Sequence, residues 1–319
     1  LYTNCGGEGS GGTLDEKWLR DFEIKHISSY TNPKKITDLA FMLSFDTRDY
    51  SEGCETHQSN FIRWLEASYL SGISTDMVFE NAQFKDFARH KRIVCAHTVM
   101  LSDNVLKKLR RYVQEGGHLI TVGDFAKYKP DGSLRSRVTI GKKSVTLGKG
   151  KVTVLPDDAC FDKYHWVLNI NRFETDYVRA SKEVPEYAVD KLRATGGKTL
   201  LEAISDDTIM KVTSEQDVYA SLFKVRNGYA LNITNVQDTI GKTGVANHKL
   251  PITAYEKGAT AIKNDIKIDI SMDIPVKKIT LYSPERNRSL SIPFVNTDSK
   301  LSFIVPKNKF AGYALIEIK

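Results

Sequence analysis

Strands and helices alternate between residues 36 and 122, and this alternation constrains the fold more than any other feature of the sequence. Residues 36–44 form a nearly continuous apolar run, which is typical of a strand buried on both faces of a parallel sheet. Further strands are expected at 74–79, 92–97 and 118–122, and helices at 59–71 and 103–114. Gly116-Gly117 follows the last helix as a C′ glycine does. The short connections predict a doubly wound α/β domain.

The second half of the chain follows a different pattern. Residues 137–155 are expected to form a hairpin through Gly148-Lys149-Gly150, and residues 161–201 to be mostly helical. From residue 208 onward, short alternating segments are separated by Gly, Pro, Asn or Asp. They lie at 218–225, 229–234, 266–270, 278–282, 289–294, 301–305 and 313–318. Short strands at this spacing predict an antiparallel β-sandwich.

These patterns divide the 319 residues into three stretches. Residues 1–34 comprise a glycine-rich linker and a lead-in helix at 15–27. Residues 35–205 form the α/β domain with its helical insert, and residues 206–319 form the β-sandwich. The linker matches G-x-G-x-x-G at residues 7–12, but the phosphate-binding version needs a strand before the loop and a helix after it. We therefore interpret it as a flexible segment.

Charge and composition exclude several classes of function. The net charge is +7, yet the basic residues are scattered. The densest run, Lys107, Lys108, Arg110 and Arg111, lies on an amphipathic segment and suits a solvated helix face, so no nucleic-acid partner is expected. The apolar runs are too short to span a bilayer. Four cysteines, of undecided disulfide state, are spaced too widely for paired zinc ligands, so we expect no metal and no cofactor. They are Cys5, Cys54, Cys95 and Cys160.

Residues 45–57 carry the candidate binding residues. This expected polar loop follows the first strand, and open α/β sheets bind ligands at the carboxyl ends of their strands. The candidates for a ligand site or an active-site rim are Asp46, Arg48, Asp49, Tyr50 and His57. This mixture of charges, a phenol and an imidazole suits the binding of a sugar or a partner.

No catalytic residue is expected. The turn at 121–125, after the fourth strand, has no Ser or Cys that could act as a nucleophile. Cys95 lies inside an expected strand, where a buried structural thiol is the usual role. A glycosidase needs two carboxyl groups roughly 5 to 9.5 Å apart. The acidic residues of the expected loops suit solvated positions instead.

Several segments carry a resemblance to a known family. They are residues 38–44, 61–65, 92–96, 101–103 and 109–120, the last being a helix that ends in Tyr-Val-x-x-Gly-Gly before a strand. Together they resemble the trimerisation domain that follows the catalytic barrel in family 42 glycoside hydrolases, the β-galactosidases. The resemblance implies a fold similar to flavodoxin and to class I glutamine amidotransferases, without the catalytic cysteine. Residues 17–32 and 279–284 look like the lead-in helix and the C-terminal β-domain of such enzymes.

The resemblance implies a function without catalysis in this chain. A (β/α)₈ barrel needs roughly 250 residues, which do not fit before residue 36, so no catalytic glutamate is carried over. We expect the non-catalytic C-terminal region of a secreted or periplasmic carbohydrate-active enzyme, whose missing barrel binds the sugar substrate. Its role would be to support the barrel, complete the active-site rim or form a homo-oligomer. Two alternatives stay open: a hydrolase that uses the 45–57 segment, and a stand-alone carbohydrate-binding protein with Trp64 or Trp166 stacked on sugar rings. Trp64 falls on the apolar side of its expected helix, so we predict that it belongs to the core.

Overall fold

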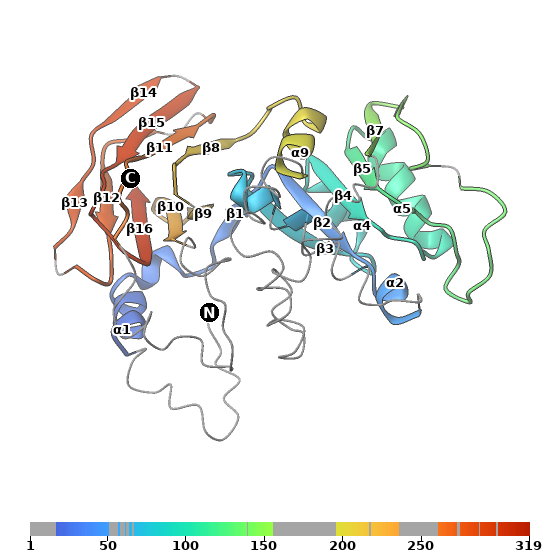
Figure 1. The fold of residues 1–319 in the computed structure, drawn as a ribbon, viewed down its shortest axis with the longest axis horizontal. Coiled ribbons are helices and arrows are strands. Elements are labelled where there is room, and N and C mark those ends of the chain that lie inside the picture. The colour runs from blue at the N-terminus through green and yellow to red at the C-terminus, as the bar shows by residue number, and fades with distance from the viewer. Residues whose placement is uncertain are drawn as a thin grey trace, which may run out of the picture.

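The computed structural model consists of a mixed α/β part and a β-rich part that lie at opposite ends of its long axis (Figure 1). The structure describes residues 17–50, 57, 61, 64–65, 67–138, 140–155, 196–216, 218–235, 261–272, 275–286, 288–297 and 299–319. Most of the expected helical insert at 161–201 therefore lies outside the described residues, as do the glycine-rich start, Trp166, Cys5, Cys54 and Cys160. The described end of the insert contains helix α9 (Lys198–Ala203).

A six-stranded, mostly parallel sheet forms the centre of the α/β part. Its order is β3-β2-β4-β5-β7-β6, and only the edge strand β6 runs antiparallel to its neighbour. The strands are β2 (Leu39–Leu43), β3 (Thr75–Phe79), β4 (Arg92–Ala96), β5 (His118–Val122), β6 (Val145–Leu147) and β7 (Gly150–Leu155). The strands predicted at 74–79, 92–97 and 118–122 and the hairpin near Gly148 are thereby confirmed.

Helices cover both faces of this sheet because side chains alternate along each strand. Phe41 and Val94 pack with Trp64 and Leu200 on one face, whereas Met42 and Ile93 contact the opposite helices. The helices there are α4 (Phe84–Ala88) and α5 (Asp103–Gln114). Trp64 is 1% exposed, which confirms its prediction as a core residue and contradicts the alternative in which it stacks on a sugar.

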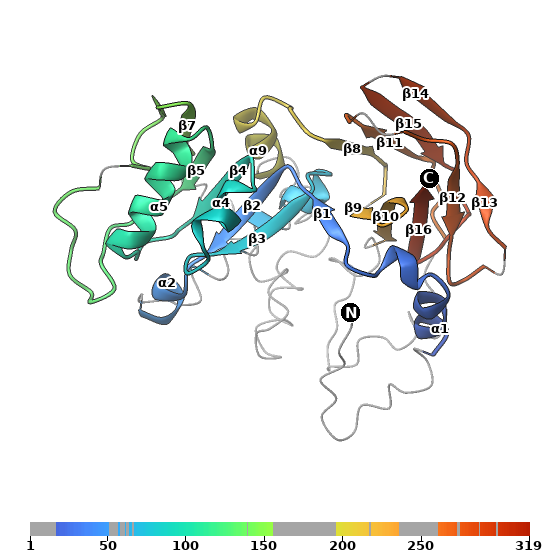
Figure 2. The same ribbon diagram turned by 180° about the vertical axis from the view of Figure 1, so that it is seen from behind.

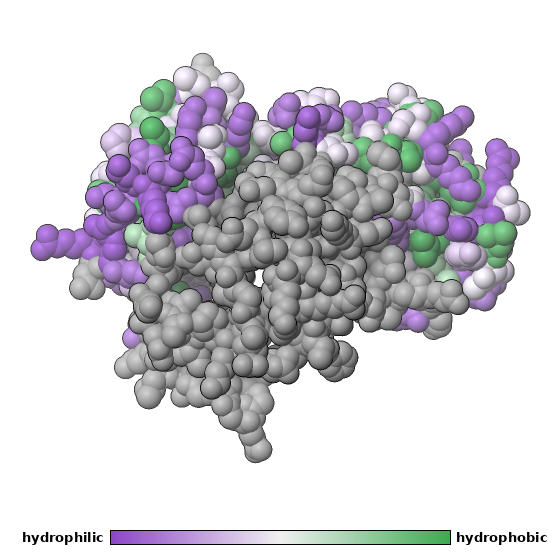
Figure 3. Space-filling model, viewed as in Figure 1, coloured by the Kyte–Doolittle hydropathy of each residue, from purple (hydrophilic) through white to green (hydrophobic). Residues whose placement is uncertain are grey.

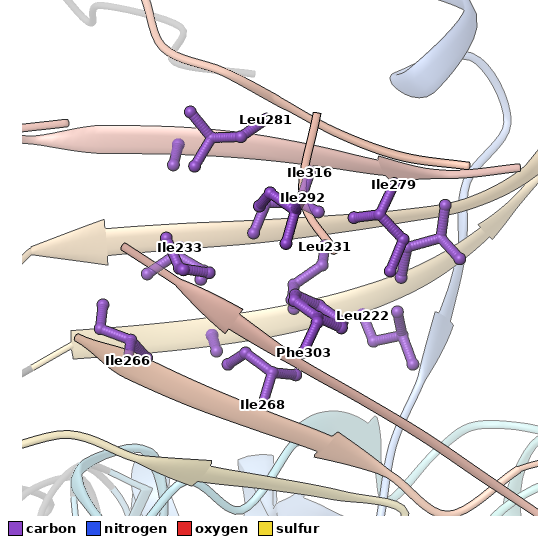
Figure 4. Packing of buried hydrophobic residues seen from close by; sticks show 14 of the residues in the cluster. Leu222, Leu231, Ile233, Ile266, Ile268, Ile279, Leu281, Ile292, Phe303 and Ile316 are labelled. Carbon is purple, nitrogen blue, oxygen red and sulfur yellow. The ribbon is translucent and has the colours of Figure 1, made fainter. Parts of the chain in front are cut away.

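Two antiparallel sheets with one shared hydrophobic core make up the β-rich part (Figure 4). One sheet has the order β1-β9-β10-β16-β12-β13 and the other β14-β15-β11-β8. Ile233 and Ile316 of the first sheet meet Ile268 and Phe303 of the second in that core. The strands are β1 (Lys34–Ile36), β8 (Met210–Thr213), β9 (Val218–Val225), β10 (Gly228–Asn235), β11 (Ile266–Ile270), β12 (Ile279–Tyr282), β13 (Leu290–Ser291), β14 (Phe294–Thr297), β15 (Lys300–Val305) and β16 (Tyr313–Ile318).

Two strands predicted as single segments are divided in the structure. The run at 36–44 splits before Asp38, because β1 pairs with β9 in the β-rich part while β2 enters the parallel sheet. The run at 289–294 splits into β13 and β14 at Pro293, which has no N–H for a ladder hydrogen bond. Both differences arise where the chain changes its pairing partner.

The lead-in segment packs on the β-rich part, as Figure 2 shows from behind. It consists of α1 (Lys17–Lys25) and a short 3₁₀ turn (Ile27–Ser29). Phe22 is buried with Ala230 and Leu315, in agreement with the apolar spacing of the predicted helix. The Ser29 hydroxyl donates to Glu317 Oε1 at 2.8 Å, which ties the segment to β16.

Candidate functional site

The carboxyl ends of β2 and β3 meet in a buried polar cluster. Glu80, directly after β3, is 4% exposed. Its Oε2 accepts a hydrogen bond from the Ser44 hydroxyl at 2.7 Å, and its Oε1 accepts one from the backbone N–H of Asp46 at 2.8 Å. Burial raises the pKa of the Glu80 carboxyl. Open α/β sheets bind ligands at this edge, so the cluster is the candidate site.

The start of the segment predicted as a polar loop is a helix, α2 (Phe45–Tyr50). Ser44 caps it, because the Ser44 hydroxyl accepts from the Thr47 N–H at 3.0 Å. Thr47 also donates through Oγ1 to the carbonyl of Met100 at 2.9 Å and accepts from the Met100 N–H at 3.0 Å. These bonds fix α2 to the segment that follows β4. Ser44 belongs to the residue types that helix N-caps favour, and this was the signal in the sequence for a helix start.

His57 braces the strand ends rather than facing a ligand. The imidazole is 1% exposed, and its Nε2 accepts from the Ser44 N–H at 3.3 Å. Nδ1 must therefore carry the proton, and it lies 3.1 Å from the His97 carbonyl and 3.2 Å from that of Ala96. Burial lowers the pKa of His57, so the ring is neutral near pH 7. Both ring nitrogens are engaged, which leaves neither for proton transfer.

The other predicted residues lie on the outer side of α2. Arg48 Nε donates to Asp49 Oδ1 at 2.6 Å, and its guanidinium lies 4.9 Å from the centre of the Phe45 ring. Partial burial and the neighbouring Asp49 raise the pKa of Asp46. Tyr50 ends α2, and its side chain lies outside the described part. The structure thus places Asp46, Arg48 and Asp49 on α2, where they are partly or fully exposed, and buries His57.

Glu80 is the residue that reasoning from the sequence missed. It follows an expected strand directly, so the rule that selected residues 45–57 would also have selected it. His97, at the end of β4, adopts a left-handed φ of 46°. Gly123, with φ of 66°, lies against the His97 ring, and a Cβ at Gly123 would come within 2.5 Å of that ring. No pattern in the sequence predicts this contact.

The described residues offer little for metal or thiol chemistry. They contain no group of three or more His, Cys, Asp or Glu side chains that could hold a metal ion. Cys95 is a free, fully buried thiol, and burial raises its pKa above the usual range, which disfavours the reactive thiolate. No helix within the described ranges is long and apolar enough to cross a membrane.

Three solved structures share this fold. An alpha-L-fucosidase isoenzyme 2 from Paenibacillus thiaminolyticus is 12% identical with a TM-score of 0.54, and the match covers 93% of this chain and 51% of that protein. A beta-galactosidase from Bacillus circulans sp. alkalophilus is 10% identical with a TM-score of 0.50, and the match covers 91% of this chain and 42% of that protein. A catalytic mutant of a GH42 beta-galactosidase from G. stearothermophilus is 9% identical with a TM-score of 0.50, and the match covers 90% of this chain and 41% of that protein.

The likeness concerns the fold alone at these identities, and the chain spans about half of the fucosidase and two fifths of each beta-galactosidase. No protein-family model and no curated protein sequence matches the chain.

Proposed function

We propose that this chain is the non-catalytic C-terminal region of a carbohydrate-active enzyme of the β-galactosidase type. In this proposal residues 35–205 are an amidotransferase-like, doubly wound domain and residues 206–319 a β-sandwich. They support a catalytic barrel, complete its active-site rim or hold copies of the enzyme together, outside the cytoplasm. The observation that carries the proposal is the coverage, because more than 90% of this chain matches only half of a fucosidase and 42% of a beta-galactosidase.

The chemistry at the candidate site supports a role without catalysis. The Ser44 hydroxyl is held by Glu80, and both nitrogens of His57 are engaged with the backbone. A serine nucleophile needs both a nearby base and access to substrate. Ser44 has a carboxylate partner in Glu80, but it is completely buried, so a substrate does not reach its hydroxyl in this structure.

The length of the native polypeptide and the activity of this chain test the proposal together. An antibody against this chain should detect, in the source cells, a polypeptide of at least twice 35.9 kDa. The purified 319-residue chain should not hydrolyse aryl β-galactosides or aryl α-L-fucosides. A native mass near 35.9 kDa, or turnover by the chain alone, would contradict the proposal.

The rival hydrolase is tested at the rim of α2. If Asp46 and Arg48 bind a sugar, the double change Asp46→Ala and Arg48→Ala should abolish any sugar affinity or change the assembly state seen by light scattering. Glu202→Ala, on an exposed helix face, is the matched control. Unchanged affinity and assembly in the double variant would remove the rim from consideration. The second rival, a stand-alone carbohydrate-binding protein, draws support from a pocket elsewhere in the chain.

A further inference from the structure

A pocket of about 580 Å³ lies between the lead-in segment and the β-rich part. One wall comes from the end of α1, and the other from the connection between β12 and β13, some 260 positions later in the sequence. Figures 1 and 2 both show α1 beside these strands. The lining residues are Phe22, Lys25, His26, Tyr282, Ser283, Arg286, Arg288 and Ser289.

The described lining of this pocket contains three cations and no carboxylate. Lys25, Arg286 and Arg288 are exposed, and none forms an ion pair with a carboxylate among the described residues. Arg286 Nη1 donates long hydrogen bonds to the carbonyls of Asn308 and Lys309, at 3.4 and 3.5 Å, which orient the side chain but leave its charge uncompensated. The pocket therefore has an excess of positive charge.

Two carboxylates lie close to this lining, and hydrogen bonds hold both in place. Glu285, next to Arg286, accepts from the backbone N–H groups of Gly312 and Tyr313 at 2.9 and 3.2 Å, and from the hydroxyl of the lining residue Ser283. Glu317 Oε1 lies 3.8 Å from His26 Nδ1, and this carboxylate accepts from Ser29 and from Lys319. The three cations of the lining outnumber these two carboxylates, one of which is paired with Lys319.

Aromatic rings form the remaining lining. The rings of Phe22 and His26 lie 4.6 Å apart, and those of His26 and Tyr282 lie 4.3 Å apart. Burial is the main cause of the lowered pKa of His26, so this ring is neutral at pH 7 and adds no charge. Ser283 and Ser289 complete the lining. The pocket thus combines a neutral aromatic side with a cationic side.

We propose that this pocket binds an acidic saccharide, a sugar unit that carries a carboxylate or a sulfate group. Arginines bind such planar or multi-oxygen anions through paired hydrogen bonds, and the apolar face of a sugar ring can pack on aromatic side chains. The volume lies within the range of small-ligand sites. The choice of a sugar rests on the proposed function, whereas the choice of an anion rests on the three cations.

Titration calorimetry of the full chain at pH 7 and low salt tests the proposal. The probes are digalacturonic acid, galactose 6-sulfate, the neutral disaccharide galactobiose and sodium sulfate. We expect at least one acidic sugar to bind ten-fold or more tightly than both galactobiose and sulfate. The double change Arg286→Gln and Arg288→Gln should weaken that binding ten-fold or more.

A charge-matched control separates the pocket from the net charge of the protein. Lys107→Gln with Arg110→Gln removes two exposed cations from α5, outside the pocket, and should change the affinity less than two-fold. Thermal melts should confirm that both double variants are folded. Equal affinity for acidic and neutral sugars, sulfate binding as tight as that of the acidic sugars, no binding at all, or unchanged binding by the Arg286/Arg288 variant would each overturn the proposal. A short native polypeptide would instead overturn only the supporting role and leave these affinities standing.

Discussion

At the scale of single residues, buried polar groups of the α/β part are held in place by backbone partners. Asp38, completely buried before β2, accepts from the N–H of Ile209 at 2.5 Å and from that of Ser74 at 3.3 Å. His57 joins the ends of β2 and β4 in the same way. Removal of one partner from such a pair lowers the free energy of unfolding, because the buried donor or acceptor that remains cannot form a hydrogen bond with water.

Asp38 should make stability depend on pH. Burial raises its pKa from 3.8 to about 6, so the folded state binds the proton more tightly than the unfolded state does. Its contribution to stability is therefore greatest below pH 4, falls between pH 4 and 6, and is constant above. The pKa difference corresponds to roughly 3 kcal/mol. In urea unfolding from pH 4 to 8, Asp38→Asn should lack this decline. If the difference in the free energy of unfolding between the wild type and Asp38→Asn does not change with pH, the raised pKa of Asp38 is contradicted.

Loss of the His57 side chain should lower the free energy of unfolding much more than loss of the Arg48 side chain. His57→Ala leaves the Ser44 N–H and a strand-end carbonyl unpaired in a buried position, and we expect a loss of about 2 to 4 kcal/mol in the free energy of unfolding. Arg48→Ala removes a partly exposed ion pair and a contact with the Phe45 ring, and should cost about 1 kcal/mol or less. Denaturant unfolding measures both changes. If the two variants lose the same stability, His57 is not a brace.

At the scale of elements, local signals determine where helices and strands begin and end. The helix α5 begins after Ser102, whose hydroxyl accepts from the Val105 N–H at 3.3 Å, and ends before Gly116, whose φ is 120°. Both features are readable in the sequence, and the expected bounds agree with α5. The division of the run at 36–44 was not readable, because no glycine or proline separates Ile36 from β2 and the two strands differ in the distant strand that each pairs with.

The cap of α5 gives an element-scale prediction. Ser102→Ala removes the acceptor for the Val105 N–H and should lower the free energy of unfolding by about 1 kcal/mol. Asn104→Ala, an exposed change in the same first turn, should cause no loss. Thermal unfolding monitored by circular dichroism compares the two. A greater loss for Asn104→Ala would show that the cap does not stabilise α5.

At the scale of the whole molecule, a small polar junction joins the α/β part to the β-rich part. Asp207, just before β8, forms ion pairs with Lys91 and with the buried Arg92. Its Oδ2 lies 2.6 Å from Arg92 Nη2. The Asp38–Ile209 bond lies beside it in the sequence. Away from the junction, hydrophilic side chains cover much of the described surface in the view of Figure 3, with apolar patches separated from one another.

Breaking this junction should loosen the connection between the two parts. Asp207→Ala leaves the buried Arg92 without its carboxylate, and because Asp207 is itself 58% exposed we expect a loss of only about 1 to 2 kcal/mol. Limited proteolysis should cut the variant faster near residue 207 than the wild type. Glu202→Ala, whose pair with Lys198 is exposed, is the control and should be cut at the wild-type rate. Equal rates for all three proteins would contradict the role of the junction.

Most strands of both halves and the end of α5 at Gly116 could be predicted from the sequence, because apolar periodicity and turn residues act within a few positions of each other. The order of the strands also predicted that residues 45–57 follow the carboxyl end of the first strand of the parallel sheet. Three contacts became visible in the folded chain alone: Glu80 meets Ser44, β1 joins the other sheet, and Lys25 lines the same pocket as Arg286 and Arg288. Those contacts join residues 36 to more than 260 positions apart, and pairing over such distances depends on how the whole chain packs rather than on any local pattern.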